Sequence, residues 1–211
     1  MIEGQKEKYW SKYAYSYDDG VDYVVGKALN QAIIERLYRE HLGEVIEYGC
    51  GSGYFTKAIA KNAKHIIATD LSDEMLEMAR VQLRGLNNVT IQKADCENSS
   101  FPSRRFDSVL IANLIHVIKT PSNALQESYR VLKTGGLLLA VDYTGYSMNF
   151  FEKMKLSIRY LKQWGIPPRH VRSKLSPDKF TSLMKSAGFK VDDVQLIGDK
   201  TKALYLKCRK N

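Results

Sequence analysis

Short apolar segments alternate with stretches of helical periodicity over the first 145 residues of this chain, and no other feature restricts its fold as strongly. Each apolar segment is short enough for a strand and apolar along its whole length. Strands of this kind are buried on both faces, as in a parallel sheet that helices cover on either side. Five such strands are expected, at residues 44–48, 65–69, 89–92, 107–112 and 137–141.

The segments between these strands carry helix signals. Ser72 is a favourable N-cap residue, and the apolar side chains after it recur on one helical face. Pro121 is expected at the first position of another helix, which the Gly-Gly pair at 135–136 is expected to end. The apolar face after Ser72 consists of Met75, Leu76, Ala79 and Leu83, and the further expected helices cover residues 8–40 and 54–62.

The last part of the chain has a different pattern. A Ser-Pro pair at 176–177 is expected to open a helix that ends at Gly188, and strand-like segments follow at residues 191–197 and 203–208. Because only a short turn separates these two segments, they are expected to pair as an antiparallel hairpin. A chain of 211 residues is long enough for one sizeable core. The sequence therefore predicts a single α/β domain, residues 1–211, with a mostly parallel seven-stranded sheet in a three-layer sandwich.

The junction of the first strand and the next helix reads Glu47-Tyr-Gly49-Cys-Gly51-Ser-Gly53. Glycines at such a junction allow a sharp turn and let a ligand approach the backbone where a Cβ would block it. Asp70 ends the second strand, where a carboxylate can accept hydrogen bonds from both hydroxyls of a ribose. The glycine spacing differs from the G-x-G-x-x-G of dinucleotide-binding proteins. Glu47 would repel a pyrophosphate, whereas it suits a ligand that carries an ammonium or a sulfonium group.

From about residue 44 to residue 143 the chain resembles the class I S-adenosylmethionine (SAM)-dependent methyltransferases. The resemblance rests on the glycine loop, Asp70, Asp95 after the third strand, Phe-Asp at 106–107 and Leu-Lys-Thr-Gly-Gly at 132–136. It implies a Rossmann-like methyltransferase fold and SAM as methyl donor, with the loop on the methionine part, Asp70 on the ribose and Asp95 on the adenine. The cofactor-binding residues that it implies are Tyr17, Glu47, Gly49, Cys50, Gly51, Ser52, Gly53, Asp70, Leu71, Met75, Asp95, Cys96 and Asn113.

The segment from Trp10 to Asp18 is rich in aromatic residues. It resembles the lead-in of small-molecule methyltransferases, in particular those of ubiquinone and menaquinone biosynthesis, in which this segment closes over the cofactor. The resemblance implies that residues 1–40 form a helical lid and that Tyr17 lies near the sulfonium, a cation that an aromatic face favours. The alternative is that these aromatic side chains only hold an accessory helix against the core.

Residues after the fourth and fifth strands bear on the acceptor. His116 is the candidate general base, because an imidazole accepts protons near neutral pH; the alternative is a histidine that caps or packs against the next helix. Tyr143 is a candidate acceptor contact. Residues 113–116 lack the Pro-Pro-aromatic motif of many methyltransferases that act on exocyclic amines of bases. Asp142 has no convincing partner ligands in the sequence, so no metal is expected.

The basic excess of the chain, +9 in all, lies in its last third, where residues 146–211 hold 15 Lys and Arg against five Asp and Glu. Residues 146–175 are expected to form the acceptor-recognition insert, with Arg169 and His170 as acceptor contacts. A basic amphipathic helix in this segment suits an anionic or lipid-like small molecule, a lipid–water interface or RNA. The alternative is a packed helix with a solvated basic face. The apolar face of this helix is formed by Phe150, Met154, Ile158 and Leu161.

No apolar run in the sequence approaches the ~18 residues that a membrane span needs, and the N-terminal residues lack the apolar core of a signal peptide. Three cysteines at wide spacings form neither a zinc pattern nor a disulfide framework. These features predict a cytoplasmic protein; they do not predict its oligomeric state.

The sequence favours a methyltransferase for a small-molecule acceptor. Two other hypotheses stay open: an RNA- or protein-directed methyltransferase that docks through the basic tail, and a SAM-binding protein without catalysis. The chain shows no appended recognition domain, which weighs against the nucleic-acid partner. An NAD(P)-dependent oxidoreductase is the rival with different chemistry, and the glycine spacing argues against it.

Overall fold

The computed structural model describes residues 8–168 and 175–211. At its centre is a seven-stranded sheet with the order β3-β2-β1-β4-β5-β7-β6. Six strands run in one direction and β7 runs against them, so that β6 and β7 form the expected antiparallel hairpin. The predicted fold class is confirmed. The strands are β1 (Gly43–Tyr48), β2 (Ala63–Asp70), β3 (Val89–Lys93), β4 (Phe106–Ala112), β5 (Leu132–Thr144), β6 (Phe189–Ile197) and β7 (Lys202–Lys210).

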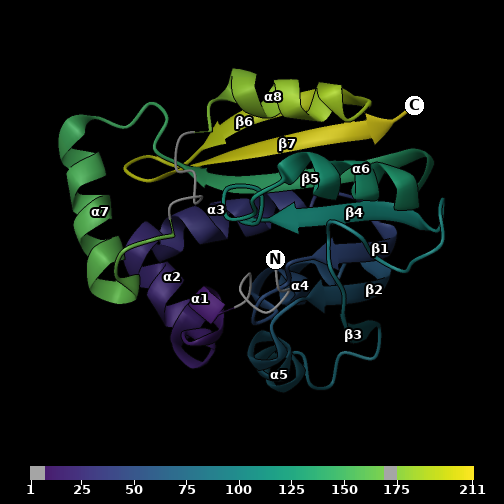
Figure 1. Cartoon of the computed structure of the whole chain (residues 1–211), viewed down its shortest axis with the longest axis horizontal. Coiled ribbons are helices and arrows are strands. Elements are labelled where there is room, and N and C mark those ends of the chain that lie inside the picture. Colours follow the sequence, from purple (N-terminus) through teal and green to yellow (C-terminus); the bar gives the residue numbers. More distant parts are fainter. Residues whose placement is uncertain (1–7, 169–174) are drawn as a thin grey trace.

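Helices cover both faces of the sheet and give three layers (Figure 1). Neighbouring residues along a strand serve opposite faces: Val45 packs in the core that contains residues of α2 to α5, and Ile46 packs in the core with α6 and α8. This double burial explains why the strands are apolar along their whole length. The helices on the two faces are α2 (Tyr17–Val25), α3 (Lys27–Leu37), α4 (Tyr54–Ile59) and α5 (Asp73–Gln82) on one, and α6 (Pro121–Val131) and α8 (Pro177–Ser186) on the other.

Two predicted boundaries are wrong. The N-terminal segment is not one helix but four short pieces, and Gly26, with a φ of 92°, separates α2 from α3. The helix α6 does not reach the Gly-Gly pair at 135–136, which lies inside β5. Leu132 is fully buried and pairs with Phe106 of β4. This pairing starts β5 before the Gly-Gly pair, which the sequence had suggested as the end of a helix. The first two N-terminal pieces are α1 (Lys8–Ser11) and a 3-10 turn, η2 (Ala14–Ser16).

The strand order creates a crevice for a ligand. The strand β1 lies between β2 and β4. The chain first builds β2 and β3 on one side of β1 and then crosses over to build β4 and β5 on the other side. In open α/β sheets ligands bind at such a switch point, outside the carboxyl ends of the strands. The ends of β1, β2 and β4 therefore bring the glycine loop, Asp70 and Asn113 to one edge of the sheet.

One further helix, α7 (Phe150–Trp164), lies outside the two layers and packs on α2 (Figure 1). It begins with a capping box, in which the Asn149 side chain accepts from the Glu152 amide while the Glu152 carboxylate accepts from the Asn149 amide. None of the helices in the described part of the chain combines the length and the apolar composition that a membrane crossing requires.

Candidate active site

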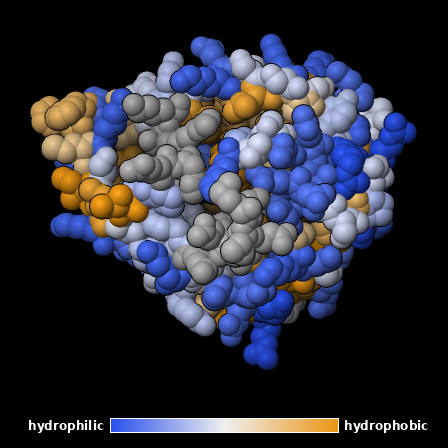
Figure 2. Space-filling model, in the orientation of Figure 1, coloured by the Kyte–Doolittle hydropathy of each residue, from blue (hydrophilic) through white to orange (hydrophobic). Residues whose placement is uncertain are grey.

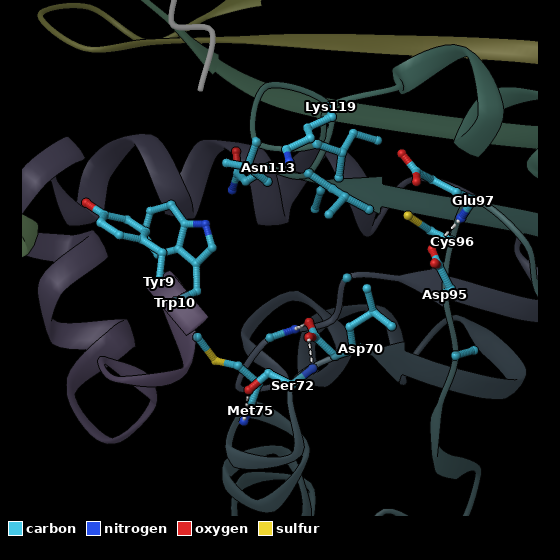
Figure 3. Close-up of a pocket in the computed structure, with 18 of the residues that line it drawn as sticks. Tyr9, Trp10, Asp70, Ser72, Met75, Asp95, Cys96, Glu97, Asn113 and Lys119 are labelled. Carbon is cyan, nitrogen blue, oxygen red and sulfur yellow. Dashed lines mark hydrogen bonds between the residues drawn. The ribbon is translucent and has the colours of Figure 1, made fainter. Parts of the chain in front are cut away.

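A cavity of about 370 Å³ lies at the carboxyl ends of the parallel strands. In Figure 3, Tyr9 and Trp10 lie on one side of it and Asp95, Cys96 and Glu97 on the opposite side. Nine residues that the sequence assigned to the cofactor line this cavity: Tyr17, Gly49, Gly51, Asp70, Leu71, Met75, Asp95, Cys96 and Asn113.

The glycine loop presents its backbone to the cavity. Gly49, Gly51 and Gly53 have φ values of 71°, 54° and 89°, in the left-handed region that glycine adopts without strain. A Cβ on Gly51 would project toward the ring of Tyr17, 3.8 Å away, and the sulfur of Met75, 4.0 Å away, both of which line the cavity. The absence of a side chain at Gly51 therefore leaves space for a ligand beside the loop.

The carboxylate of Asp70 is held in place at the end of β2. Its Oδ2 accepts a hydrogen bond of 3.0 Å from the Gly51 amide, and its Oδ1 accepts one of 2.9 Å from the Ser72 amide (Figure 3). The same carboxylate thus joins the glycine loop to the start of α5. These two hydrogen bonds hold the Asp70 carboxylate and the glycine loop in one position beside the cavity, where a ligand would bind.

The other four predicted cofactor residues do not line the cavity. Glu47 is 1% exposed and accepts a 2.6 Å hydrogen bond from the Thr56 hydroxyl. Cys50 is buried, and Gly53 is the N-cap of α4. The buried Ser52 donates a hydrogen bond to Asp18 and thereby ties the loop to α2. Glu47 and Ser52 thus connect the loop to α4 and α2. A direct contact with the cofactor stays a prediction for all four residues.

The pKa of the Glu47 carboxyl is raised to about 7, mainly because burial strips the charged form of its hydration. The Thr56 hydrogen bond lowers this pKa, and the negative charge of the nearby Asp70 raises it. In the unfolded chain this carboxyl ionises near its ordinary value of 4.5. Ionisation therefore favours the unfolded chain. The stability that Glu47 confers is present below pH 4.5 and is lost as the pH rises through about 7.

Glu47→Gln is consequently expected to gain stability relative to the wild type as the pH rises from 5 to 8, by an amount on the order of 3 kcal/mol. Urea unfolding of the ligand-free proteins across this range would measure the difference. Glu44→Gln, at the outer end of the same strand, is the matched control. A constant difference between Glu47→Gln and the wild type would contradict the raised pKa.

Aromatic side chains of the N-terminal segment line one side of the cavity and pack against the end of α7. The hydroxyls of Tyr9 and Tyr13 donate to the Trp164 carbonyl, at 2.9 and 2.6 Å. The rings of Trp10 and Tyr17 lie 5.5 and 6.2 Å from that of Trp164. The structure thus places Tyr17 in the cavity wall. Its position beside the sulfonium and the movement of the segment as a lid stay predictions.

His116 follows β4 and is paired with a buried acid. Its Nδ1 hydrogen-bonds with Oδ1 of Asp142, and its backbone amide donates to Oδ2 of the same carboxylate at 3.2 Å. The Asp142 side chain is fully buried, and that of His116 is 13% exposed. The flanking Leu114 and Val117 line the cavity, whereas His116 is not among its lining residues. Sequence reasoning missed this pair, because it weighed Asp142 only as a metal ligand.

The predicted acceptor contacts are not gathered at the cavity. The Tyr143 hydroxyl donates to Oδ1 of Asn30 at 2.5 Å, and the Asn30 amide donates to Asp22 at 2.8 Å, in a partly buried series of polar side chains. Burial raises the pKa of the Tyr143 phenol well above its ordinary value. Tyr143 is not among the cavity-lining residues. Arg169 and His170 lie outside the described residues.

The structure adds cavity residues that the sequence did not indicate. Val117, Ile118 and Lys119 come from the irregular segment after β4, which has no periodicity to mark them, and Pro168 follows α7. Lys119 brings a cation to the wall (Figure 3). Across residues 8–168 and 175–211, His, Cys, Asp and Glu side chains form no group of three or more that could hold a metal ion.

Residues 46–140 match the family model of a methyltransferase domain. The chain is 30% identical, over 169 residues, to 2-methyl-6-phytyl-1,4-hydroquinone methyltransferase 2 of Oryza sativa subsp. japonica, covering 78% of this chain and 43% of that protein. It is 29% identical over 171 residues to the ubiquinone/menaquinone biosynthesis C-methyltransferase of Pasteurella multocida, covering 69% of this chain and 62% of that enzyme. The chain therefore spans less than two thirds of the length of these relatives.

Two solved structures share the fold over nearly the whole chain. The S-adenosylhomocysteine complex of DhpI has a TM-score of 0.73 and 26% identity, with 96% of this chain and 94% of that chain covered. A SAM-dependent methyltransferase from Aquifex aeolicus has a TM-score of 0.71 and 19% identity, with 95% and 98% covered. With the glycine loop and Asp70 at the cavity, residues 46–140 match a methyltransferase domain, and the chain is similar in sequence and fold to SAM-dependent methyltransferases of the class I type.

Proposed function

We propose that this protein transfers the methyl group of SAM to a small aromatic hydroxyl compound of the hydroquinone type. The observation that carries the proposal is a single cavity whose wall combines the glycine loop and Asp70 with aromatic and aliphatic side chains. The named relatives that act on hydroquinone and quinone precursors support this acceptor class.

The residues of the cavity suit SAM. Asp70 offers a carboxylate for the ribose hydroxyls, and the open backbone at Gly51 admits the methionine part without a side chain in the way. Asp95 and Cys96, on the side opposite Trp10, would flank the adenine (Figure 3). Tyr17 offers an aromatic ring to the cationic end of the ligand. Buried Glu47 and Ser52 would keep the loop in the shape that binding requires.

When bound, SAM supplies a methyl group on a positively charged sulfur. The chain's own contribution would be to align the acceptor with that methyl group and to exclude water. Trp10 and Tyr17, which pack against Trp164, would exclude water on one side. The apolar Leu114, Val117 and Ile118 would contact the acceptor ring. Lys119 would favour an acceptor that has lost a hydroxyl proton, and it also suits a carboxylated one.

His116 would act as the general base in this scheme. A hydroxyl that loses its proton makes a phenolic oxygen or its ring carbon a stronger nucleophile, and the proton passes to the imidazole. Asp142 would orient the ring through Nδ1 and stabilise the imidazolium that results. The other ring nitrogen, Nε2, makes no hydrogen bond to another of the described residues. Val117, the residue that follows His116, lines the cavity.

The test is methyl transfer from isotopically labelled SAM to a panel of hydroquinones, catechols and phenolic carboxylates, with products identified by mass. Transfer of label to a panel compound, with little loss on raising the salt concentration, is expected. Bulk RNA in the same assay addresses the alternative raised by the basic C-terminal third. Transfer to RNA that falls steeply with salt would replace the small-molecule acceptor by a nucleic acid. SAM binding without transfer to any acceptor would indicate a non-catalytic protein.

A further inference from the structure

The helix α7 exposes an apolar face to solvent. Phe150, Phe151 and Ile158 are 74%, 67% and 46% exposed. With Met154 and Leu161, which are also exposed, they fall within an arc of about 100° on a helix of 3.6 residues per turn. In Figure 2 hydrophobic side chains gather at the left of the molecule, where Figure 1 shows α7. We call these five residues the α7 apolar face.

A different side of α7 holds the helix against the domain. The opposite side of α7 is already packed: Leu156, Tyr160 and Trp164 contact the core that contains α2. Gln163 lies over Gly20 of α2, where a Cβ would come within 2.8 Å of the Gln163 amide nitrogen. The helix is therefore capped at its first turn and packed against the core on its inner side. Because these contacts fix its rotation, the α7 apolar face points toward solvent.

Basic side chains border the α7 apolar face. Lys155, Arg159 and Lys162 follow it along one side of the helix, and Lys153 lies on the other side. The first three line a groove together with Tyr23 and with Lys200, which comes from the turn between β6 and β7. Four cations from two separate parts of the chain thus gather beside the exposed apolar side chains.

We propose that the α7 apolar face and its basic border dock this protein on the surface of an anionic lipid bilayer. A helix lying in the interface buries its apolar arc at the boundary of headgroups and acyl chains, while lysine and arginine at its borders reach the lipid phosphates. The two signals add, because each basic residue near an anionic surface contributes about 1 kcal/mol. Both signals are present on α7, on the same side of the molecule.

Charge and composition favour a bilayer over other occupants. A symmetric dimer built on this face would bring the cations of two copies into one interface, where like charges repel. Nucleic acid would bind the cations but would leave the five apolar side chains exposed to water. An anionic bilayer satisfies both parts of the surface. The proposal goes beyond methyl transfer and does not depend on which acceptor is used.

Flotation with lipid vesicles tests the proposal on the full chain. The wild type is expected to float with phosphatidylcholine vesicles that contain about 30% phosphatidylglycerol, and much less with phosphatidylcholine alone. Phe151→Ser combined with Ile158→Ser is expected to weaken binding by about 10-fold or more, because both side chains would otherwise leave water. Val81→Ser, which alters a 65% exposed apolar residue on α5, is the matched control and should bind as the wild type does.

The basic border is tested separately. Lys155→Gln combined with Lys162→Gln is expected to reduce binding to the anionic vesicles by about 10-fold. Lys57→Gln combined with Lys179→Gln, on α4 and α8, removes the same charge elsewhere and should have little effect. Titration with S-adenosylhomocysteine, expected to be unchanged in all variants, verifies their fold independently of any methyl transfer.

Three results would overturn the proposal. The first is a wild type that does not float with anionic vesicles. The second is flotation that the α7 variants and their controls lower equally. The third is a wild-type dimer that Phe151→Ser and Ile158→Ser dissociate, in the absence of vesicle binding, which would make this face a contact between two copies.

Discussion

Asp70→Ala is expected to lower the affinity for S-adenosylhomocysteine by at least ~100-fold. Hydrogen bonds to a charged group contribute about 1.5–3 kcal/mol each, and about 1.4 kcal/mol corresponds to a factor of ten in affinity. Loss of the bonds to two ribose hydroxyls accounts for the predicted effect. The substitution also removes the acceptor for the Gly51 and Ser72 amides and so loosens the loop against which the ligand binds.

Isothermal titration with S-adenosylhomocysteine measures this effect without any knowledge of the acceptor. Asp73→Ala is the matched control, because Asp73 lies only three residues away and pairs with Lys93 at the surface, outside the cavity. Its affinity should equal that of the wild type. Asp70→Asn keeps the shape and loses the charge, so its affinity should lie between those of wild type and Asp70→Ala. Wild-type affinity in Asp70→Ala would disprove the assignment of the cofactor site.

His116→Ala is expected to lower turnover by about 10²- to 10⁴-fold, the range that general-base catalysis contributes, with the affinity for S-adenosylhomocysteine unchanged. Asp142→Asn should also lower turnover, because the imidazole would lose the carboxylate that orients it through Nδ1. Turnover of the best hydroquinone of the panel, measured with saturating SAM, gives the comparison. His65→Ala, on β2, removes a histidine away from the cavity and should leave turnover unchanged.

The split between turnover and binding distinguishes a base from a packing residue. Loss of a base lowers turnover and leaves the affinity for S-adenosylhomocysteine unchanged, whereas loss of packing lowers both. Full turnover in His116→Ala would remove the histidine from the reaction and leave the alignment of the acceptor as the main contribution of the chain.

Much of the fold and the cofactor side of the site could be predicted from the sequence, because those signals are local. A strand buried on both faces must be apolar along its length, as residues 107–112 are, and this holds whichever neighbours it has. A backbone that turns with positive φ beside a ligand needs glycine, as at Gly51. Ser72 caps α5 as predicted, its side chain accepting from the Met75 amide at 3.1 Å.

The tertiary structure alone decided which side chains of the loop face the cavity. The sequence placed Glu47 and Gly51 in one motif, yet the first is buried against Thr56 and the second borders the cavity. The pairing of His116 with Asp142 joins the ends of β4 and β5, which are neighbours only because of the strand order. Periodicity alone does not fix that order.

The surroundings of α7 show the same division. Its sequence determined an amphipathic helix with Phe150, Met154, Ile158 and Leu161 on one side, and this pattern by itself would predict that the apolar side packs inward. The fold packs Leu156, Tyr160 and Trp164 inward instead and leaves the predicted face in solvent. The physical reason is that hydrophobic periodicity and turns depend on residues that are close in the sequence, so the sequence alone determines them. Which face meets the core depends on contacts between residues far apart in sequence, and these exist only in the folded protein.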